Sequence, residues 1–318
     1  MPQLFPVESL AGSGSDQLVY NECMVTGVLA PVPTPFDEQD RVDLVRLRAA
    51  FARWVASPLS GFIVLGSNGE AALMDEDESD RVVGAAREIV PSGRAFIVGT
   101  GRESTQATIR ATRRAAALGA DAVLVRTPGF FKSQMTTDVF VRHYRAVADA
   151  SPVPVLLYNF TAVTGVNLLP AAVSRLATHP NIVGMKESGG DVAQIADLVA
   201  QTPASFAVLA GSSATFYAAL CVGAAGGILA LAGLVPEPCV RLFELTREGR
   251  HEEARALQQQ LMPLGRLLGQ VYGVAGLKAA MRLTGCDVGV PRPPLAPVPD
   301  AGLAALREAL AQFQAAAA

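Results

Sequence analysis

The chain has 318 residues, of which 50% are apolar, 17% charged and 6% aromatic. This composition supplies a large packed core and excludes disordered, collagen-like and low-complexity proteins. The formal net charge of −3 provides no excess of cations for neutralising phosphates, so nucleic acid is not an expected partner. The four cysteines and three histidines are scattered, which argues against a metal site and a disulfide framework. We therefore expect a soluble, cytoplasmic protein without a metal.

Two segments are relevant to targeting and membranes. Residues 1–22 contain no Arg or Lys, whereas import presequences are Arg-rich and secretory signals have a basic start. We interpret this stretch as a flexible N-terminal extension. Residues 218–235 are wholly apolar, close to the ~20 residues that a membrane span needs. Their many glycines and alanines fit a buried helix and strand better, so no membrane is expected.

From residue 25 onward, short β-branched runs alternate with Ala- and Arg-rich stretches of helical character. Eight runs predict strands, at 25–30, 61–65, 95–99, 121–125, 153–158, 181–186, 206–210 and 226–231. Helices are predicted between them, for example at 43–55, 76–89, 105–118 and 191–199. Near-continuous apolar runs are typical of parallel strands buried on both faces. Eight such units predict an α/β protein with a (β/α)8 TIM barrel at 23–236, and a doubly wound open sheet is the alternative.

Beyond the eighth strand, the sequence predicts helices at 237–246, 252–268 and 275–283. A proline-rich segment at 290–299 follows, and then a final helix to residue 316. These elements predict a C-terminal helical region, 237–318, packed on the barrel rather than a second core.

Lysine is rare in this chain. Of the 26 basic residues 23 are arginine, and the three lysines are Lys132, Lys186 and Lys278. Because Arg does not deprotonate, each lysine is a candidate for amine chemistry, the alternative being an ordinary surface residue. Lys186 ends the sixth predicted strand, and barrels carry their active groups at the carboxyl ends of strands. An amine there is partly removed from water, which favours its neutral, nucleophilic form, unless it simply pairs with a carboxylate such as Glu187.

Other polar groups end neighbouring strands. Tyr158 ends the fifth predicted strand, one βα unit before Lys186, and a phenol beside an amine–carbonyl adduct can shuttle protons. The segment Gly66-Ser67-Asn68-Gly69 follows the second strand. Its glycines let backbone N–H groups approach a ligand, and together with Ser67 and the next helix N-terminus it suits a carboxylate.

These motifs resemble the dihydrodipicolinate synthase/N-acetylneuraminate lyase family over residues 25–297. The similarity rests on Gly66-Ser67-Asn68-Gly69-Glu70, Tyr158-Asn159 and Gly184-Met185-Lys186-Glu187, with support from Thr34-Pro35-Phe36, Gly99-Thr100-Gly101 and Arg292-Pro293-Pro294-Leu295. Within the family, the segments 103–108, 179–186 and 188–191 are similar to the 4-hydroxy-2-oxoglutarate aldolase branch.

The resemblance implies a cofactor-free Schiff-base lyase that acts on a 2-oxo acid (the pyruvate half) and an aldehyde, assembled as a homotetramer or homodimer. It implies that Lys186 attacks the ketone, that Tyr158 relays protons, and that Ser67 is a further catalytic residue that holds the carboxylate with Asn68. The residues implied to bind or line the substrate are Ser67, Asn68, Gly69, Gly211 and Ile228. The expected substrate is a 2-oxo acid such as 4-hydroxy-2-oxoglutarate.

Two positions depart from the family's pattern. In synthases of this family, an Arg shortly after the tyrosine binds the carboxylate of the aldehyde substrate. This chain has Val163 at that position, which argues against a role in lysine biosynthesis. The family's Tyr pair after Thr-Pro, one of which reaches a neighbouring subunit's site, is Phe130-Phe131 here. We therefore expect the usual relay from Ser67 through that tyrosine to be broken.

Three alternatives stay open at this point. The first alternative is a dihydrodipicolinate synthase. The second is a weakly catalytic homologue that binds 2-oxo acids. The third alternative is a phosphate-binding barrel that uses Gly211-Ser212-Ser213 and Gly226-Gly227, since barrels often bind phosphate near strands seven and eight.

Overall fold

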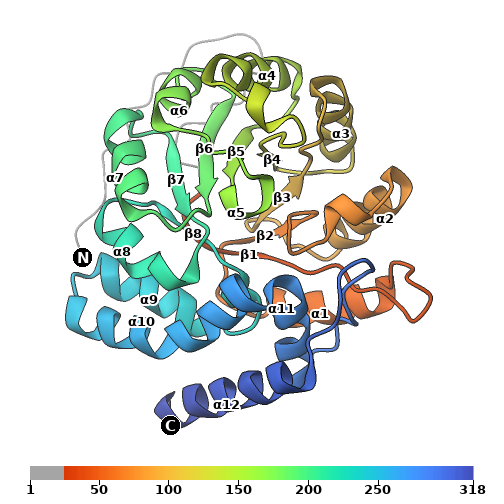
Figure 1. Cartoon of the computed structure of the whole chain (residues 1–318), viewed down its shortest axis with the longest axis vertical. Helices are drawn as coiled ribbons and strands as arrows, with labels where there is room; N and C mark the ends of the chain where they lie inside the picture. The colour runs from red at the N-terminus through yellow and green to blue at the C-terminus, as the bar shows by residue number, and fades with distance from the viewer. Residues whose placement is uncertain (1–24, 318) are drawn as a thin grey trace.

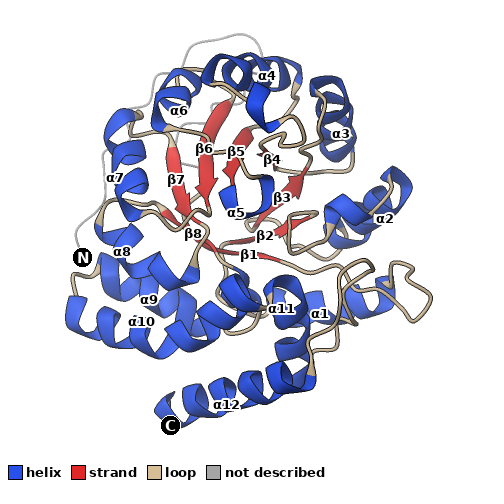
Figure 2. Cartoon of the chain, in the orientation of Figure 1, coloured by secondary structure: helices blue, strands red, loops and turns tan. Residues whose placement is uncertain are grey.

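The computed structural model describes residues 25–317, and the predicted extension at 1–22 lies outside them. Eight parallel strands close into a barrel in which each strand pairs with the next and the eighth pairs with the first (Figure 2). The strands are β1 (Gly27–Pro31), β2 (Gly61–Val64), β3 (Ala95–Gly99), β4 (Ala122–Arg126), β5 (Val155–Asn159), β6 (Ile182–Glu187), β7 (Ala207–Ala210) and β8 (Gly226–Ile228). The predicted (β/α)8 barrel is thus confirmed, and closure between β1 and β8 excludes the open sheet.

Helices surround the strands (Figure 1). They are α1 (Leu44–Val55), α2 (Glu76–Arg87), α3 (Thr105–Ala117), α4 (Thr137–Ala150), α6 (Pro170–Leu176), α7 (Val192–Gln201) and α8 (Phe216–Cys221), while the one-turn helix α5 (Thr161–Thr164) follows β5. Side chains fix where the helices begin: Asp43 accepts hydrogen bonds from two N–H groups of α1. Asp75 and Glu78 form a reciprocal capping box at α2.

The core has two parts because alternate residues of each strand face opposite sides. Outward-facing strand residues pack with the helices in one large cluster. Inward-facing residues fill the barrel in a second cluster, composed of Val25, Leu29, Ile63, Ile97, Ala122, Leu124, Leu156, Tyr158, Leu209 and Ile228. The barrel is therefore packed inside, and an inward residue at the carboxyl end of a strand, such as Tyr158, lies at the top of that packing.

The C-terminal residues form α9 (Pro236–Arg247), α10 (His251–Arg266), α11 (Gly273–Leu283) and α12 (Asp300–Ala317). The helix predicted at 252–268 ends two residues earlier, at Arg266, because a π-helical turn, Leu267–Val271, joins α10 to α11. Figure 1 shows α9 to α11 on one side of the barrel, with α12 farthest from the strands. The division into a barrel at 23–236 and a C-terminal helical region at 237–318 packed on it stays a prediction.

The apolar segment 218–235 is divided between α8, β8 and a 3-10 turn, Ala230–Gly233. Within residues 25–317, no helix has the length and apolar character needed to cross a membrane.

Candidate active site

Lys186 and Tyr158 lie side by side at the carboxyl ends of β6 and β5. Their Cα atoms are register partners of the parallel pair. The Lys186 Nζ is 3.4 Å from the phenolic oxygen of Tyr158 and 4.5 Å from the centre of its ring. Both residues are buried, with exposed fractions of 5% and 4%. The structure thus brings the predicted nucleophile and the predicted proton carrier into contact.

Glu187, the carboxylate considered as a partner for Lys186, is engaged elsewhere. It accepts hydrogen bonds from the Asn159 side chain at 2.7 Å, from the Gln194 side chain at 2.9 Å and from the Gly189 N–H. Burial raises the pKa of Glu187, and the hydrogen bonds from Asn159, Gly189 and Gln194 oppose that shift. Among the described residues Lys186 forms no ion pair, so the simple salt-bridge interpretation of this lysine is not supported.

Ser67 approaches Tyr158 from β2. Its hydroxyl oxygen lies 2.9 Å from the Tyr158 phenolic oxygen, although 91 residues separate the two in sequence. Ser67 belongs to the loop Gly66–Glu70, in which Asn68 is half-buried and Gly69 is buried. Ser67, Tyr158 and Lys186 therefore form a continuous row of two hydroxyls and one amine.

Gly211 and Ile228 line the same region from β7 and β8. A Cβ atom at Gly211 would lie 3.0 Å from Lys186 Cε and 1.9 Å from Ser188 Oγ, so a side chain there would displace the lysine or the serine. Ile228 is fully buried inside the barrel. Gly211 therefore lies beside the amine, and Ile228 belongs to the same inner cluster as Tyr158.

The sequence analysis gave Ser188 no role. Its hydroxyl is buried and has no hydrogen-bond partner among residues 25–317. It follows Lys186 by two residues, and this spacing along an extended chain is the signal that identifies it, because residues i and i+2 face the same way. A buried hydroxyl without a partner is unfavourable, so a polar substrate group that binds it would be stabilised here.

The residues that replace the family's tyrosines and arginine face solvent. Phe130 and Phe131 are 76% and 67% exposed, and Val163 on α5 is 62% exposed. The Glu103 carboxylate accepts the N–H groups of Gly129 and Phe130 and thereby fixes the loop that carries both rings. Ser67, Tyr158 and Lys186 contact one another without a phenol from this loop. That the relay from Ser67 through position 131 is broken stays a prediction.

The other two lysines have different surroundings. Lys132 is exposed. Lys278 is 1% exposed, and its Nζ lies 2.5 Å from a Glu70 carboxylate oxygen. Burial lowers the pKa of Lys278, and the charge of Glu70 opposes this shift. Of the three lysines, only Lys186 combines burial with an unpaired amine among the described residues.

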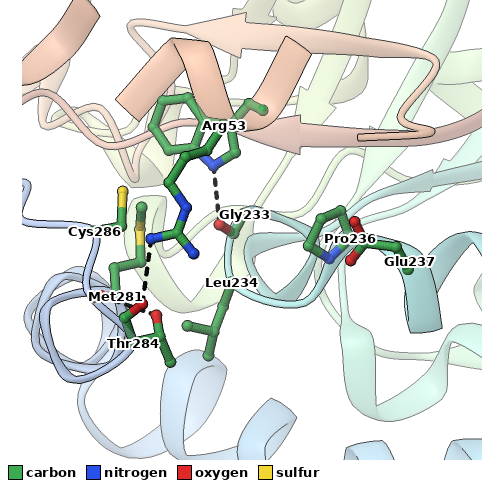
Figure 3. A pocket seen from close by; sticks show the side chains of 9 residues that line it. Arg53, Gly233, Leu234, Pro236, Glu237, Met281, Thr284 and Cys286 are labelled. Carbon is green, nitrogen blue, oxygen red and sulfur yellow. Dashed lines mark hydrogen bonds between the residues drawn. The ribbon is translucent and has the colours of Figure 1, made fainter. Parts of the chain in front are cut away.

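A separate cavity of about 130 Å³ lies between α1, the turn after β8 and the end of α11 (Figure 3). Trp54 donates to the Gly233 carbonyl at 2.9 Å and Arg53 to the Thr284 carbonyl at 3.3 Å. The residues that line it include none of the row from Ser67 to Lys186. This cavity is therefore not part of the candidate active site.

Other kinds of site have little support. Residues 25–317 contain no group of three or more His, Cys, Asp or Glu side chains that could hold a metal. Gly226 and Gly227 lie within β8, and a Cβ at Gly227 would come within 2.7 Å of the Phe216 ring. Strand packing thus explains this pair of glycines without a phosphate ligand.

A closed barrel with a buried amine, a phenol and a hydroxyl together at its carboxyl end is typical of enzymes that make or break carbon–carbon bonds next to a carbonyl. The model of the dihydrodipicolinate synthetase family matches residues 24–313. The chain therefore belongs to this family and is a lyase of the aldolase type, which confirms the predicted family and enzyme class.

The chain is 37% identical over 297 residues to a probable mitochondrial 4-hydroxy-2-oxoglutarate aldolase of Emericella nidulans, covering 92% of this chain and 96% of that protein. It is 35% identical over 291 residues to a 4-hydroxy-tetrahydrodipicolinate synthase of an Exiguobacterium species, covering 91% and 98%. The crystal structure of dihydrodipicolinate synthase from Thermotoga maritima superposes with a TM-score of 0.88 at 30% identity, covering 92% and 99%. Relatives of both names cover nearly the whole chain, so the substrate has to be argued from the site.

Proposed function

We propose that this protein is a class I aldolase that cleaves 4-hydroxy-2-oxoglutarate, or a closely related 2-oxo acid, through a Schiff base on Lys186. The observation that carries the proposal is the row Ser67–Tyr158–Lys186, with distances of 2.9 and 3.4 Å between the polar atoms. A buried amine without an ion-pair partner is suited to nucleophilic attack on a ketone, and the adjacent phenol is suited to moving the protons that this attack requires.

In the first step, the Lys186 nitrogen forms a bond to C2 of the 2-oxo acid. The carbonyl oxygen takes up two protons, one of them from the attacking nitrogen, and leaves as water, so that an iminium ion remains. Tyr158 is the phenol close enough to supply and recover these protons, since its oxygen lies 3.4 Å from the lysine nitrogen. Ser67 bonds to the same phenol and extends the proton path toward the mouth of the barrel.

In the second step, the C4 hydroxyl loses its proton and the C3–C4 bond breaks. The electron pair of that bond moves into the iminium and gives an enamine, while C4 leaves as the aldehyde glyoxylate. Protonation of the enamine at C3 and hydrolysis by water then release pyruvate and the free amine. The overall reaction consumes one molecule of 4-hydroxy-2-oxoglutarate and forms one pyruvate and one glyoxylate. It needs no oxidant, reductant or cofactor.

The substrate carboxylate next to the ketone is assigned to the loop of Ser67, Asn68 and Gly69, where hydroxyl, amide and backbone donors meet. Gly211 leaves room beside the lysine, and Ile228 forms the floor below it. The unpaired hydroxyl of Ser188 is assigned to the distal half of the substrate, because it is a free polar group beside the lysine chain. The predictions of a cytoplasmic location and of a homodimer or homotetramer are retained on the family resemblance.

The second candidate function is 4-hydroxy-tetrahydrodipicolinate synthase, which is favoured by the name of the Exiguobacterium relative. Val163 argues against it, because an exposed valine cannot bind the carboxylate of a second substrate. The third candidate, a 2-oxo-acid-binding homologue with little turnover, shares the pocket and differs only in rate.

The test combines a substrate panel with trapping of the adduct. Pyruvate release is followed with lactate dehydrogenase on 4-hydroxy-2-oxoglutarate and related 2-oxo acids, and condensation of pyruvate with aspartate semialdehyde is measured separately. Borohydride with pyruvate is expected to give a stable adduct on Lys186, and neither Lys186→Ala nor Lys186→Arg is expected to form it there. An adduct on Lys132 or Lys278, or unchanged labelling of Lys186→Ala, would contradict the assignment of Lys186 as the nucleophile. An adduct without turnover of any substrate would favour the binding homologue.

A further inference from the structure

The loop that carries Ser67 and Asn68 is bracketed by two residues with left-handed backbone. Leu65 has φ +56° and Glu70 has φ +55°, and neither is a glycine. Such conformations are unfavourable for residues with a side chain and persist only where the surrounding structure fixes them. Besides its own turn hydrogen bonds, from Gly69 N–H to Gly66 O and from Glu70 N–H to Ser67 O, the loop therefore needs contacts from outside to hold this conformation.

A buried ion pair from the C-terminal helices supplies one of these contacts. Lys278 on α11 places its Nζ 2.5 Å from one Glu70 carboxylate oxygen, and both side chains are 1% exposed. The other carboxylate oxygen accepts the backbone N–H of Arg292 at 2.8 Å. The Lys278 Nζ also donates to the Val290 carbonyl at 2.9 Å and lies 4.6 Å from the centre of the Phe36 ring. The residue that ends the loop is thus held by α11 and by the segment after it.

Further contacts hold the neighbouring backbone. The Arg292 guanidinium donates to the Leu73 carbonyl at 2.8 Å and to both carboxylate oxygens of Glu78, at 2.7 and 2.5 Å. Thr34 donates its hydroxyl proton to the Gly69 carbonyl at 2.7 Å. The loop is consequently fixed at its end and along the turn that follows it, while Ser67 itself is exposed.

A buried ion pair adds little to stability compared with apolar residues of similar size, because both charges lose their water. The Glu70–Lys278 pair therefore needs an explanation other than stability. Its position supplies one, since Glu70 lies three residues from the serine that bonds Tyr158.

We propose that Lys278 is a positioning residue for the substrate carboxylate: through Glu70, it holds the loop Gly66–Glu70 so that Ser67 meets Tyr158 and the loop donors face the substrate. The role assigned to the substrate rests on the proposed function, whereas the effect of Lys278 on the loop does not. The C-terminal helices thereby contribute to the active site without touching the substrate.

The test uses Lys278→Met and Glu70→Gln, which remove one charge each and keep the approximate side-chain size. The matched control is Asp287→Asn, which breaks another ion pair between the C-terminal region and the barrel, the 3.3 Å contact with Arg46. In both test variants we expect the pyruvate concentration for half-maximal borohydride trapping to rise roughly ten- to a hundredfold, with saturating pyruvate still labelling Lys186. We also expect faster hydrogen exchange confined to peptides that cover 65–74, and wild-type behaviour for Asp287→Asn in both measurements.

The two readouts separate this proposal from the proposed function. If wild-type protein forms no adduct with pyruvate, the proposed function fails, and hydrogen exchange alone then decides the role of Lys278. Unchanged half-saturation and unchanged exchange in folded Lys278→Met would overturn the positioning role. Equal acceleration of exchange across all strands, or failure of both variants to fold, would overturn it too, because the pair would then serve the stability of the whole barrel.

Discussion

The hydroxyl of Ser67 and the phenol of Tyr158 lie 2.9 Å apart and join β2 to β5 across the mouth of the barrel. Either oxygen can donate in this contact, so a proton can pass in both directions. Because Tyr158 also reaches Lys186 at 3.4 Å, the two hydroxyls and the amine form one path within a single chain. Tyr158 contacts both other groups and is therefore the central member of the path.

Replacing Tyr158 by phenylalanine removes that central member and keeps the ring. General acid–base assistance of this kind contributes about 10²- to 10⁴-fold to the rate, so we expect kcat for pyruvate release to fall within that range. The ring still packs inside the barrel, so the urea midpoint is expected to change little. Steady-state kinetics with the lactate dehydrogenase assay measures the effect. A Tyr158→Phe variant within threefold of the wild-type rate would show that another group moves the proton.

Replacing Phe131 by tyrosine adds the phenol that the family's pattern has at this position. We expect less than a threefold change in kcat, because Ser67 already has Tyr158 as its hydrogen-bond partner and the Phe131 ring is 67% exposed. Phe130→Tyr, on the other exposed ring of the same loop, is the matched control. A rise of tenfold or more that is specific to Phe131→Tyr would show that a second phenol limits the wild-type reaction.

Val163 determines the expected outcome with aspartate semialdehyde. A charge-assisted, bidentate contact to a carboxylate is worth about 2–4 kcal/mol, which corresponds to roughly 30- to 1,000-fold in kcat/KM. We therefore expect condensation of pyruvate with aspartate semialdehyde to be less efficient, by such a factor, than the same reaction in a synthase that has the arginine. Val163→Arg should raise kcat/KM for the semialdehyde. Val163→Met introduces a long, unbranched side chain like that of arginine but without a charge, and it should not raise kcat/KM. A kcat/KM of the wild type for the semialdehyde that matches that of an authentic synthase would refute the argument.

The barrel and the position of its reactive groups could be predicted because both follow from local patterns. Eight β-branched runs at regular spacing allow few arrangements other than a closed parallel barrel. Parallel strands bring their carboxyl ends to one edge, so Tyr158 and Lys186 were expected to be neighbours, as their register shows. The eighth strand ends at Ile228, earlier than predicted. The predicted strand is too long because the apolar run continues through the buried 3-10 turn that follows, and apolar character alone does not distinguish a strand from such a turn.

The contacts between side chains could not be predicted, because they depend on loops and on helices far apart in sequence. The direct bond from Ser67 to Tyr158 depends on the path of a strained loop. The partner of Lys278 depends on how α11 packs against that loop. The sequence shows Ser188 and Glu70 only as parts of motifs, although burial of their polar side-chain atoms is what gives each of them its physical importance.

His143 on α4 is another residue whose surroundings could not be predicted from the sequence. The ring is 6% exposed, its Nδ1 lies 2.9 Å from the Thr105 hydroxyl, and its Nε2 is buried without a partner among the described residues. Burial lowers the pKa of His143 from 6.5 to about 4, and the nearby charge of Glu103 opposes this shift. The folded protein therefore holds this histidine neutral over a pH range in which the unfolded chain protonates it.

The sign of the effect on stability follows from this difference. Between pH 6.5 and about 4 the unfolded chain binds the additional proton, so the free energy of unfolding falls as the pH decreases through that window. At pH 5.0 the loss from His143 amounts to about 2 kcal/mol relative to pH 7.5. We expect His143→Gln, which keeps a group able to bond Thr105, to lose correspondingly less stability between these two pH values in urea titrations. His251→Gln, which removes an exposed imidazole on α10, is the control and should follow the wild type. The same pH dependence in His143→Gln and in the wild type would mean that His143 is protonated equally in the folded and unfolded chain.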